Sequence, residues 1–138
     1  MNLSQFYING KWVDPVKPQT LNVINPATEE PIGKLSVGSE HDINSAVRAA
    51  RSAFKTFSKT KVSERLELLV EIRNIYKKRY DEISHAIMTE MGAPIKLASG
   101  AQASVGLGHL KTAIRVLEEQ KFEYIHNNMI IRKEPIGV

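Results

Sequence analysis

Histidine and carboxylate side chains are the first candidates for chemistry in this 138-residue chain. No two of its histidines have the i, i+4 spacing that places two imidazoles on one helix face for a metal ion. The four histidines are His41, His85, His109 and His126. Glu67 and Glu71 lie one helical turn apart, but arginines flank them, which favours a charged solvent face over an acid–base pair. These residues predict no catalytic site.

The glycines near residue 106 partly match the pattern of a phosphate-binding loop. Gly106-Leu107-Gly108 begins like the dinucleotide-binding pattern Gly-x-Gly-x-x-Gly, but Lys111 stands where the third glycine is required. The segment also follows a helix-like pattern rather than a strand. The sequence therefore predicts close helix packing for these glycines and no cofactor-binding residue.

The chain contains no cysteine. Disulfides, thiolate metal sites and a thiol nucleophile within this chain are therefore excluded. The N-terminus has neither a basic region nor an apolar region of the kind found in signal peptides, and no apolar run is long enough to cross a bilayer. We expect a cytoplasmic protein with no membrane contact.

The net charge of +4 is concentrated in one stretch. Between Val47 and Tyr80 there are ten basic and three acidic residues, whereas the rest of the chain is slightly acidic. A basic helical stretch can bind phosphates. Here the acidic residues alternate with the basic ones at helical spacing and no exposed aromatics are interleaved, so a solvated face is favoured and nucleic-acid binding is not expected.

The spacing of apolar residues predicts an α/β fold. Phe6–Ile8 and Lys11–Val13 flank Asn9-Gly10, which predicts a type I′ hairpin. Two further short strands flank a turn at 25–28. Helices are then predicted from an N-cap at Asp42, from near Ser63, from near Asp81 to Gly92, and over 94–119. A second hairpin follows, with its tip at Asn127-Asn128.

Six stretches, taken in order, resemble the beginning of the aldehyde dehydrogenase superfamily. They are Phe6-Tyr7-Ile8-Asn9-Gly10-Lys11-Trp12, Val23 to Glu30 with Ile32-Gly33, Asp42 to Phe54, Ser63-Glu64-Arg65 with Leu68-Leu69, Glu90-Met91-Gly92-Ala93-Pro94, and Arg132 to Val138. Met91 and Ala93 depart from the family's Glu-Thr-Gly-Lys-Pro turn. Each stretch is weak alone, but together they cover nearly the whole chain in register.

The resemblance implies an NAD(P)-dependent oxidation of an aldehyde to a carboxylate. In the family, a cysteine thiolate attacks the aldehyde, an asparagine side chain and a backbone N–H hold the oxyanion, hydride passes to the nicotinamide, and a glutamate-activated water hydrolyses the thioester. None of these residues maps onto the present sequence. We therefore expect an N-terminal segment that is inactive by itself and that binds neither NAD nor NADP alone.

The resemblance also divides the chain into two parts. Residues 1–121 correspond to the N-terminal part of the cofactor-binding domain, and residues 122–138 to the start of the oligomerisation arm. The 122–134 hairpin is expected to pair with another copy of the chain or with a full-length subunit, since Met129-Ile130-Ile131 would otherwise form an exposed apolar edge. Without a partner, we expect a large exposed apolar patch and self-association.

A monovalent cation site is implied by the same resemblance. Some family members hold such a cation through backbone oxygens near the Asn-Pro turn and an acidic side chain before the Gly-x-Pro turn. The corresponding positions here are Val23, Ile24 and Glu90.

Two hypotheses in which the chain has no catalytic role remain beside the enzyme hypothesis. In one, the basic helices from Arg48 to Arg79 bind an anionic partner, which a steep salt dependence would reveal. In the other, the terminal hairpin alters the assembly of full-length subunits, which size-exclusion chromatography with and without such a subunit would reveal.

Overall fold

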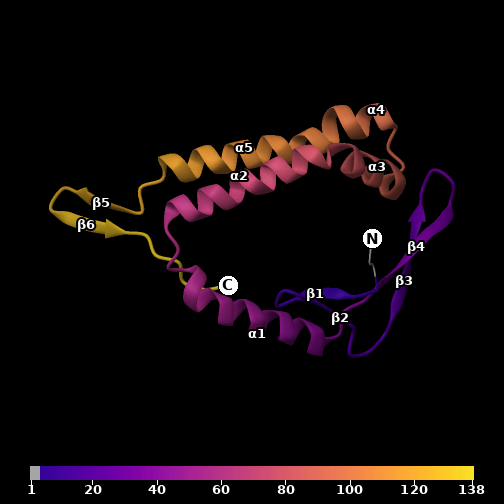
Figure 1. Cartoon of the computed structure of the whole chain (residues 1–138), viewed down its shortest axis with the longest axis horizontal. Coiled ribbons are helices and arrows are strands. Elements are labelled where there is room, and N and C mark those ends of the chain that lie inside the picture. Colours follow the sequence, from indigo (N-terminus) through magenta and orange to yellow (C-terminus); the bar gives the residue numbers. More distant parts are fainter. Residues whose placement is uncertain (1–3) are drawn as a thin grey trace.

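The computed structural model describes residues 4–138 and contains three antiparallel strand pairs and a set of helices (Figure 1). The paired strands are β1 (Phe6–Ile8) with β2 (Lys11–Val13), β3 (Thr20–Asn25) with β4 (Glu30–Ser36), and β5 (Glu123–His126) with β6 (Met129–Arg132). The four long helices are α1 (Glu40–Phe57), α2 (Val62–Lys78), α3 (Tyr80–Met91) and α5 (Ala103–Glu119). A short α4 (Ile95–Leu97) and a π-helix, η1 (Ala98–Gln102), lead directly into α5. The predicted α/β class, with about four helices and a final hairpin, is confirmed.

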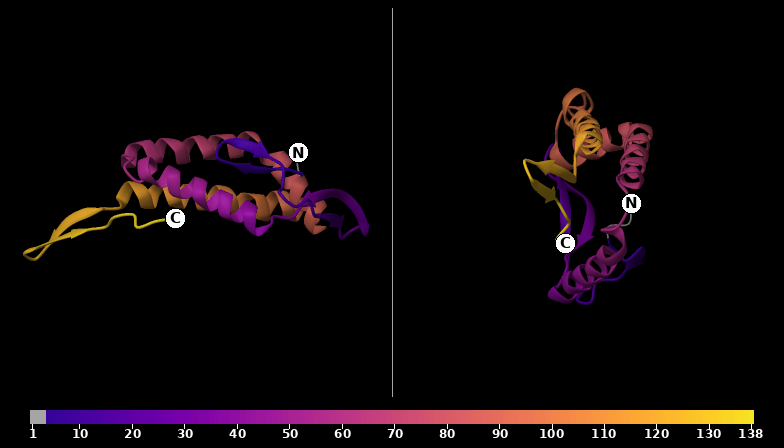
Figure 2. Two further views of the ribbon diagram at one scale, coloured as in Figure 1. Left: turned by 90° about the horizontal axis from the view of Figure 1, so that it is seen from below. Right: turned by 90° about the vertical axis from the view of Figure 1, so that its left-hand side faces the viewer.

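The three strand pairs do not join into a single sheet. Together with the helices they are arranged as a frame (Figure 1). Helices α2 and α5 pack side by side along one edge, and α1 runs along the opposite edge with β1 beside it (Figure 1). The β3–β4 pair closes one end, next to α3. The β5–β6 pair, which we call the terminal hairpin, projects beyond the other end, and the views in Figure 2 show it extending away from the helices.

The first hairpin has the turn that the sequence predicts. Asn9 and Gly10 both adopt positive φ, at 54° and 76°, and Phe6 pairs with Val13 and Ile8 with Lys11. Only residues that tolerate positive φ at both central positions form this turn without strain, and asparagine and glycine are the favoured pair. The predicted tip of the terminal hairpin is confirmed as well, since Asn127 and Asn128 connect β5 to β6.

The predicted helix start at Asp42 is wrong in its detail. Ser39 is the N-cap of α1, and Asp42 occupies the third helical position. The Asp42 carboxylate accepts hydrogen bonds from the Ser39 backbone N–H at 2.8 Å and from the Ser39 hydroxyl at 2.6 Å. It also accepts one from the Val16 N–H at 3.1 Å. Because a carboxylate three residues beyond the cap can reach back to it, the pair uses the capping-box arrangement and joins the helix to the preceding loop.

The remaining helices begin and end close to their predicted positions. Lys61 is the N-cap of α2, with its N–H donated to Glu64 at 2.7 Å. Gly92 ends α3 in the left-handed conformation, as the sequence predicts. The stretch over 94–119 is helical but not uniform, because the π-helix interrupts it.

Two tyrosines supply hydrogen bonds around that π-helix. The Tyr80 hydroxyl donates to the Ser99 carbonyl oxygen, and the Tyr76 hydroxyl donates to the Ala103 carbonyl oxygen at 2.8 Å. A π-helical turn changes the i to i−4 ladder, so neighbouring carbonyls need other partners. The tyrosines therefore join η1 and the start of α5 to α2 and α3.

The buried core is small for a chain of this mass. The buried apolar residues in the described part are Ala98, Ala103 and Ile114. The accessible surface is 10736 Å², whereas a compact monomer of 15.5 kDa would expose about 7,200 Å². The apolar stripe predicted on α1 exists as a face, but it is uncovered: Ile43 is 59% exposed. Periodicity identifies the apolar face of a helix and does not supply the element that covers it.

Candidate functional site

The corner where α3 meets β3 brings two predicted turns into contact. Gly92, at the end of α3, has φ +66°, and a Cβ added there would lie 2.8 Å from Cγ of Pro26 and 3.3 Å from the Ala27 nitrogen. Asn25 shapes the facing turn, since its side-chain oxygen accepts the Ala27 N–H at 2.9 Å. Glycine is required at this corner for both its conformation and the close approach of Pro26.

The three predicted cation ligands lie on the two elements that form this corner. Val23 is half-buried and Ile24 is exposed, both in β3, and Glu90 is exposed in the last turn of α3. The β3–β4 register shifts between Val23 and Ile24, where β4 has an additional residue, Ile32. Such a bulge disrupts the hydrogen-bond ladder and can re-aim backbone groups. Coordination by these residues remains a prediction.

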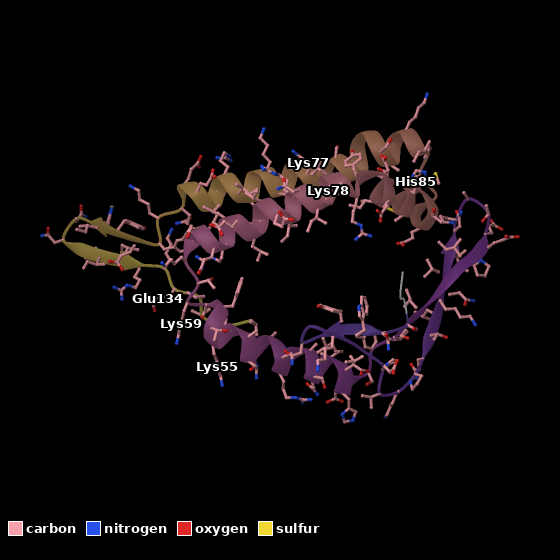
Figure 3. All side chains as sticks on the ribbon, viewed as in Figure 1. Lys55, Lys59, Lys77, Lys78, His85 and Glu134 are labelled. Atoms are coloured by element: carbon pink, nitrogen blue, oxygen red, sulfur yellow. The ribbon has the colours of Figure 1, made fainter. Side chains whose placement is uncertain are left out.

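Within residues 4–138, no group of three or more His, Cys, Asp or Glu side chains is placed to hold a metal ion. The Nδ1–H of His85, which is labelled in Figure 3, donates a hydrogen bond to the Asp81 carbonyl oxygen at 2.8 Å, a local contact within α3. Glu67 and Glu71 are exposed on α2.

The terminal hairpin is an exposed two-stranded ribbon with apolar side chains. Ile125 pairs with Ile130 across the strands, and their side chains are 75% and 68% exposed. Met129 and Tyr124 are exposed as well. An isolated two-stranded ribbon is marginally stable, and its unpaired edges are templates for another chain.

Charged side chains contact one another at the base of the hairpin. Arg132 Nε donates to Glu123 Oε2 at 2.8 Å across the paired strands, and its Nη1 lies 3.8 Å from Glu134. The hydrogen bond and charge of Glu123, with a smaller effect of Glu134, raise the pKa of Arg132 above its ordinary value. Lys133 Nζ lies 5.7 Å from the ring centroid of Tyr124. All these groups are exposed, so each contact contributes little to the free energy of folding.

An apolar hollow lies between the base of the hairpin and the junction of α1 with α2. Its volume is about 720 Å³, and Phe54, Phe57, Val62 and Phe122 are among its lining residues. The guanidinium carbon of Arg65 lies 5.6 Å from the ring centroid of Phe122, a cation–π contact. The sequence indicated Phe54 as part of an apolar stripe. It gave no sign that Phe122, which is 65 residues beyond Phe57, would line the same hollow as these two side chains.

Gly106 serves packing, as the sequence predicts, whereas a Cβ at Gly108 would meet no atom within 4 Å. A Cβ at Gly106 would overlap the side chain of Tyr76, so α5 approaches α2 closely at this point. Every strand pair in the described residues is antiparallel. No crevice at the carboxyl ends of parallel strands, where dinucleotides bind in doubly wound folds, is formed by this part of the chain.

Membrane spanning has no support in residues 4–138, since none of their helices combines the length and apolar character that a bilayer crossing requires.

Comparison with known proteins agrees with this architecture. Residues 12–138 match the sequence profile described as the aldehyde dehydrogenase family. The 3-succinoylsemialdehyde-pyridine dehydrogenase of a Pseudomonas species is 44% identical over 135 residues, which are 97% of this chain and 28% of that protein. The crystal structure of aldehyde dehydrogenase from Bartonella henselae superimposes with a TM-score of 0.87 at 41% identity, covering 90% of this chain and 26% of that one.

A second solved structure includes ligands. It is a mutant of aldehyde dehydrogenase C from Pseudomonas syringae in complex with NAD+ and octanal, with a TM-score of 0.88 and 34% identity over 91% of this chain and 26% of that one. The fold is thus that of a segment of the aldehyde dehydrogenase oxidoreductases. The chain belongs to the aldehyde dehydrogenase family. It spans less than a third of the length of the relatives described here.

Proposed function

We propose that this chain supplies scaffold and subunit contacts to an NAD(P)-dependent aldehyde dehydrogenase and does not oxidise aldehydes by itself. The family match over residues 12–138 supports the first half of the proposal. The second half is supported by the absence of cysteine from the chain, because the family mechanism needs a thiolate as nucleophile. Residues 1–121 would form part of the cofactor-binding domain.

The cofactor and the aldehyde are held by other parts of such an enzyme. The Pseudomonas syringae relative binds NAD+ and octanal. In the present chain the described strands pair only in antiparallel fashion, and the Gly106 segment packs against Tyr76. These residues do not fit a nicotinamide dinucleotide, so no step of hydride transfer is assigned to them.

The terminal hairpin is proposed as the element that joins subunits, with another copy of this chain or a full-length subunit as partner. Its exposed Ile125–Ile130 pair and its unpaired strand edges support this assignment. Burying each isoleucine fully would contribute about 1.5–3 kcal/mol. Addition of a neighbouring strand would also satisfy backbone groups at the edge.

A monovalent cation at the α3–β3 corner is a further part of the proposal. The backbone oxygens of Val23 and Ile24 and the carboxylate of Glu90 would hold it, and oxygen donors are the type that such hard cations prefer. The ladder irregularity at Val23 and Ile24 and the packing of α3 on β3 support this choice. The ion would stabilise the corner rather than take part in chemistry.

The test of the proposal has two measurements. The purified chain is incubated with octanal and NAD+ or NADP+, and reduced nicotinamide is followed by its absorbance; we expect no formation above the rate without protein. The intact mass of the protein carrying this sequence in its source is then measured. Aldehyde-dependent cofactor reduction by a protein of 15.5 kDa would contradict the proposal.

A further inference from the structure

A small pocket between α2 and α5 is lined by three cationic side chains and by no acidic one. Its volume is about 390 Å³, and it is formed by Arg73 and Lys77 of α2 with Leu107, Gly108 and Lys111 of α5. Arg73 and Lys77 are four residues apart, and Gly108 and Lys111 three apart, so each pair shares one face of its helix. The close packing of α5 on α2 at Gly106 and Tyr76 fixes these faces near each other.

The cationic groups of this pocket have no partners within the described chain. Arg73 Nε is buried without a hydrogen-bond acceptor. No ion pair of residues 4–138 includes Arg73, Lys77 or Lys111, although other basic residues nearby, such as Arg79, do form them. Like charges on one helix face repel each other. An anion in the pocket would offset that repulsion.

Lys111 distinguishes this pocket from the general basic character of the chain. The last basic residue of the stretch between Val47 and Tyr80 is Arg79, immediately before α3, whereas Lys111 is contributed by α5, whose last turn instead pairs Arg115 with Glu119. A cation brought from a second helix to face Arg73 and Lys77 is not expected of a solvated face on α2 alone. Figure 3 shows Lys77 near the C-terminal end of α2, with Lys78 beside it; Lys78 does not line the pocket.

We propose that the pocket formed by Arg73, Lys77, Gly108 and Lys111 binds a phosphate dianion, either free or as the phosphoryl group of a small phosphomonoester. The planar guanidinium of Arg73 suits two oxygens of one phosphoryl group, and the two lysines add point charges. Gly108 contributes open space, since a Cβ there would meet no atom within 4 Å. The pocket volume lies at the lower end of the range for small-ligand sites, about 300–1,000 Å³.

The test uses calorimetric titration of the 138-residue chain with inorganic phosphate and, separately, with methyl phosphate. Saturable binding of one or both is expected, and the preferred titrant shows whether the site takes free phosphate or a phosphomonoester. Lys111→Gln should weaken binding about tenfold or more, because a charge-assisted contact is lost. Lys78→Gln is the matched control: it removes the same charge from an exposed lysine next to Lys77 and should leave the affinity unchanged. Circular dichroism verifies that both variants keep the helical content.

Arg73→Lys provides a second variant that retains the charge. It should weaken binding, because an ammonium cannot present two parallel donors. Three outcomes would overturn the proposal: no saturable binding of either phosphate, equal weakening by Lys78→Gln and Lys111→Gln, or binding only of a single-stranded oligonucleotide with a steep salt dependence. The last would assign the basic surface to nucleic acid instead.

Discussion

Gly106 of α5 lies directly against the ring of Tyr76 of α2. A Cβ built on Gly106 would come within 2.6 Å of Cζ of that ring, and the Tyr76 hydroxyl donates to the Ala103 carbonyl oxygen at 2.8 Å. The missing side chain thus allows α5 to approach α2, and the hydrogen bond holds the ring in that position. The glycine that resembles part of a phosphate loop in sequence is a helix-packing residue in the fold.

Replacing Gly106 by alanine is expected to destabilise the chain. Alanine is the better helix former by about 1 kcal/mol, but the ring of Tyr76 would have to move and the overpacking costs about 1–3 kcal/mol. We expect a lower urea midpoint by fluorescence or circular dichroism.

Gly108→Ala is the matched control, two residues along the same helix. Because a Cβ at Gly108 meets nothing within 4 Å, this substitution should raise stability by up to about 1 kcal/mol. An equal response of the two glycines would show that the contact with Tyr76 does not limit packing.

The stability of the chain should fall in acid through Asp42, which is only 6% exposed. Hydrogen bonds from the Ser39 side chain and backbone, and from the Val16 backbone, hold the pKa of Asp42 below its ordinary value. A lowered folded-state pKa contributes stability above the unfolded-state pKa, and this contribution is lost as the pH falls through the folded-state value. The loss should therefore appear below about pH 4.

Asp42→Asn tests this assignment by thermal unfolding at a series of pH values. The variant should be less stable at neutral pH and should show a shallower loss in acid. Asp14→Asn, which changes an exposed carboxylate bonded to Gln5, should retain the acid sensitivity of the parent chain. An unchanged pH profile in Asp42→Asn would exclude the Ser39 contact as its source.

Gly92 and Gly10 both have positive φ, but only Gly92 is in close contact with another element. Gly10→Ala should cost about 1–2 kcal/mol, the penalty of a left-handed alanine. Gly92→Ala should cost more, by about 1–3 kcal/mol for the clash with Pro26. The comparison is made from denaturant midpoints.

Adding Pro26→Ala to Gly92→Ala should recover part of that difference, because the ring atom in conflict is removed. Additive effects of the two substitutions would argue that Pro26 and Gly92 do not interact.

Association through the terminal hairpin should depend on its exposed isoleucines. We expect a concentration-dependent increase in mass by light scattering for the parent chain, and a shift toward monomer for Ile130→Lys, because a buried charge opposes strand pairing. Ile43→Lys on α1 is the control: it changes an equally apolar exposed residue outside the hairpin. If Ile43→Lys alone dissociates the chain, the α1 face and not the hairpin forms the contact.

Local sequence patterns determined most of the individual elements. Asn9-Gly10 specified the first hairpin through the positive φ that its turn requires, Gly92 specified the end of α3, and the 3.6-residue spacing of apolar side chains located the helices. These signals act over a few residues, so they can be recognised without knowledge of the rest of the chain. Family resemblance was likewise carried by short stretches in order.

The tertiary structure alone decided which faces meet. Periodicity could not indicate that Ile43 and its neighbours on α1 remain uncovered, that Phe57 and Phe122 share a hollow, or that Arg73 and Lys111 face one pocket. The cap of α1 is a local exception: Ser39 and Asp42 are three residues apart, so the difference from the predicted cap at Asp42 arises from a capping box and not from the tertiary fold. Contacts between distant segments depend on the path of the whole chain, whereas turns and caps depend on neighbouring residues; that difference separates what the sequence determined from what the fold decided.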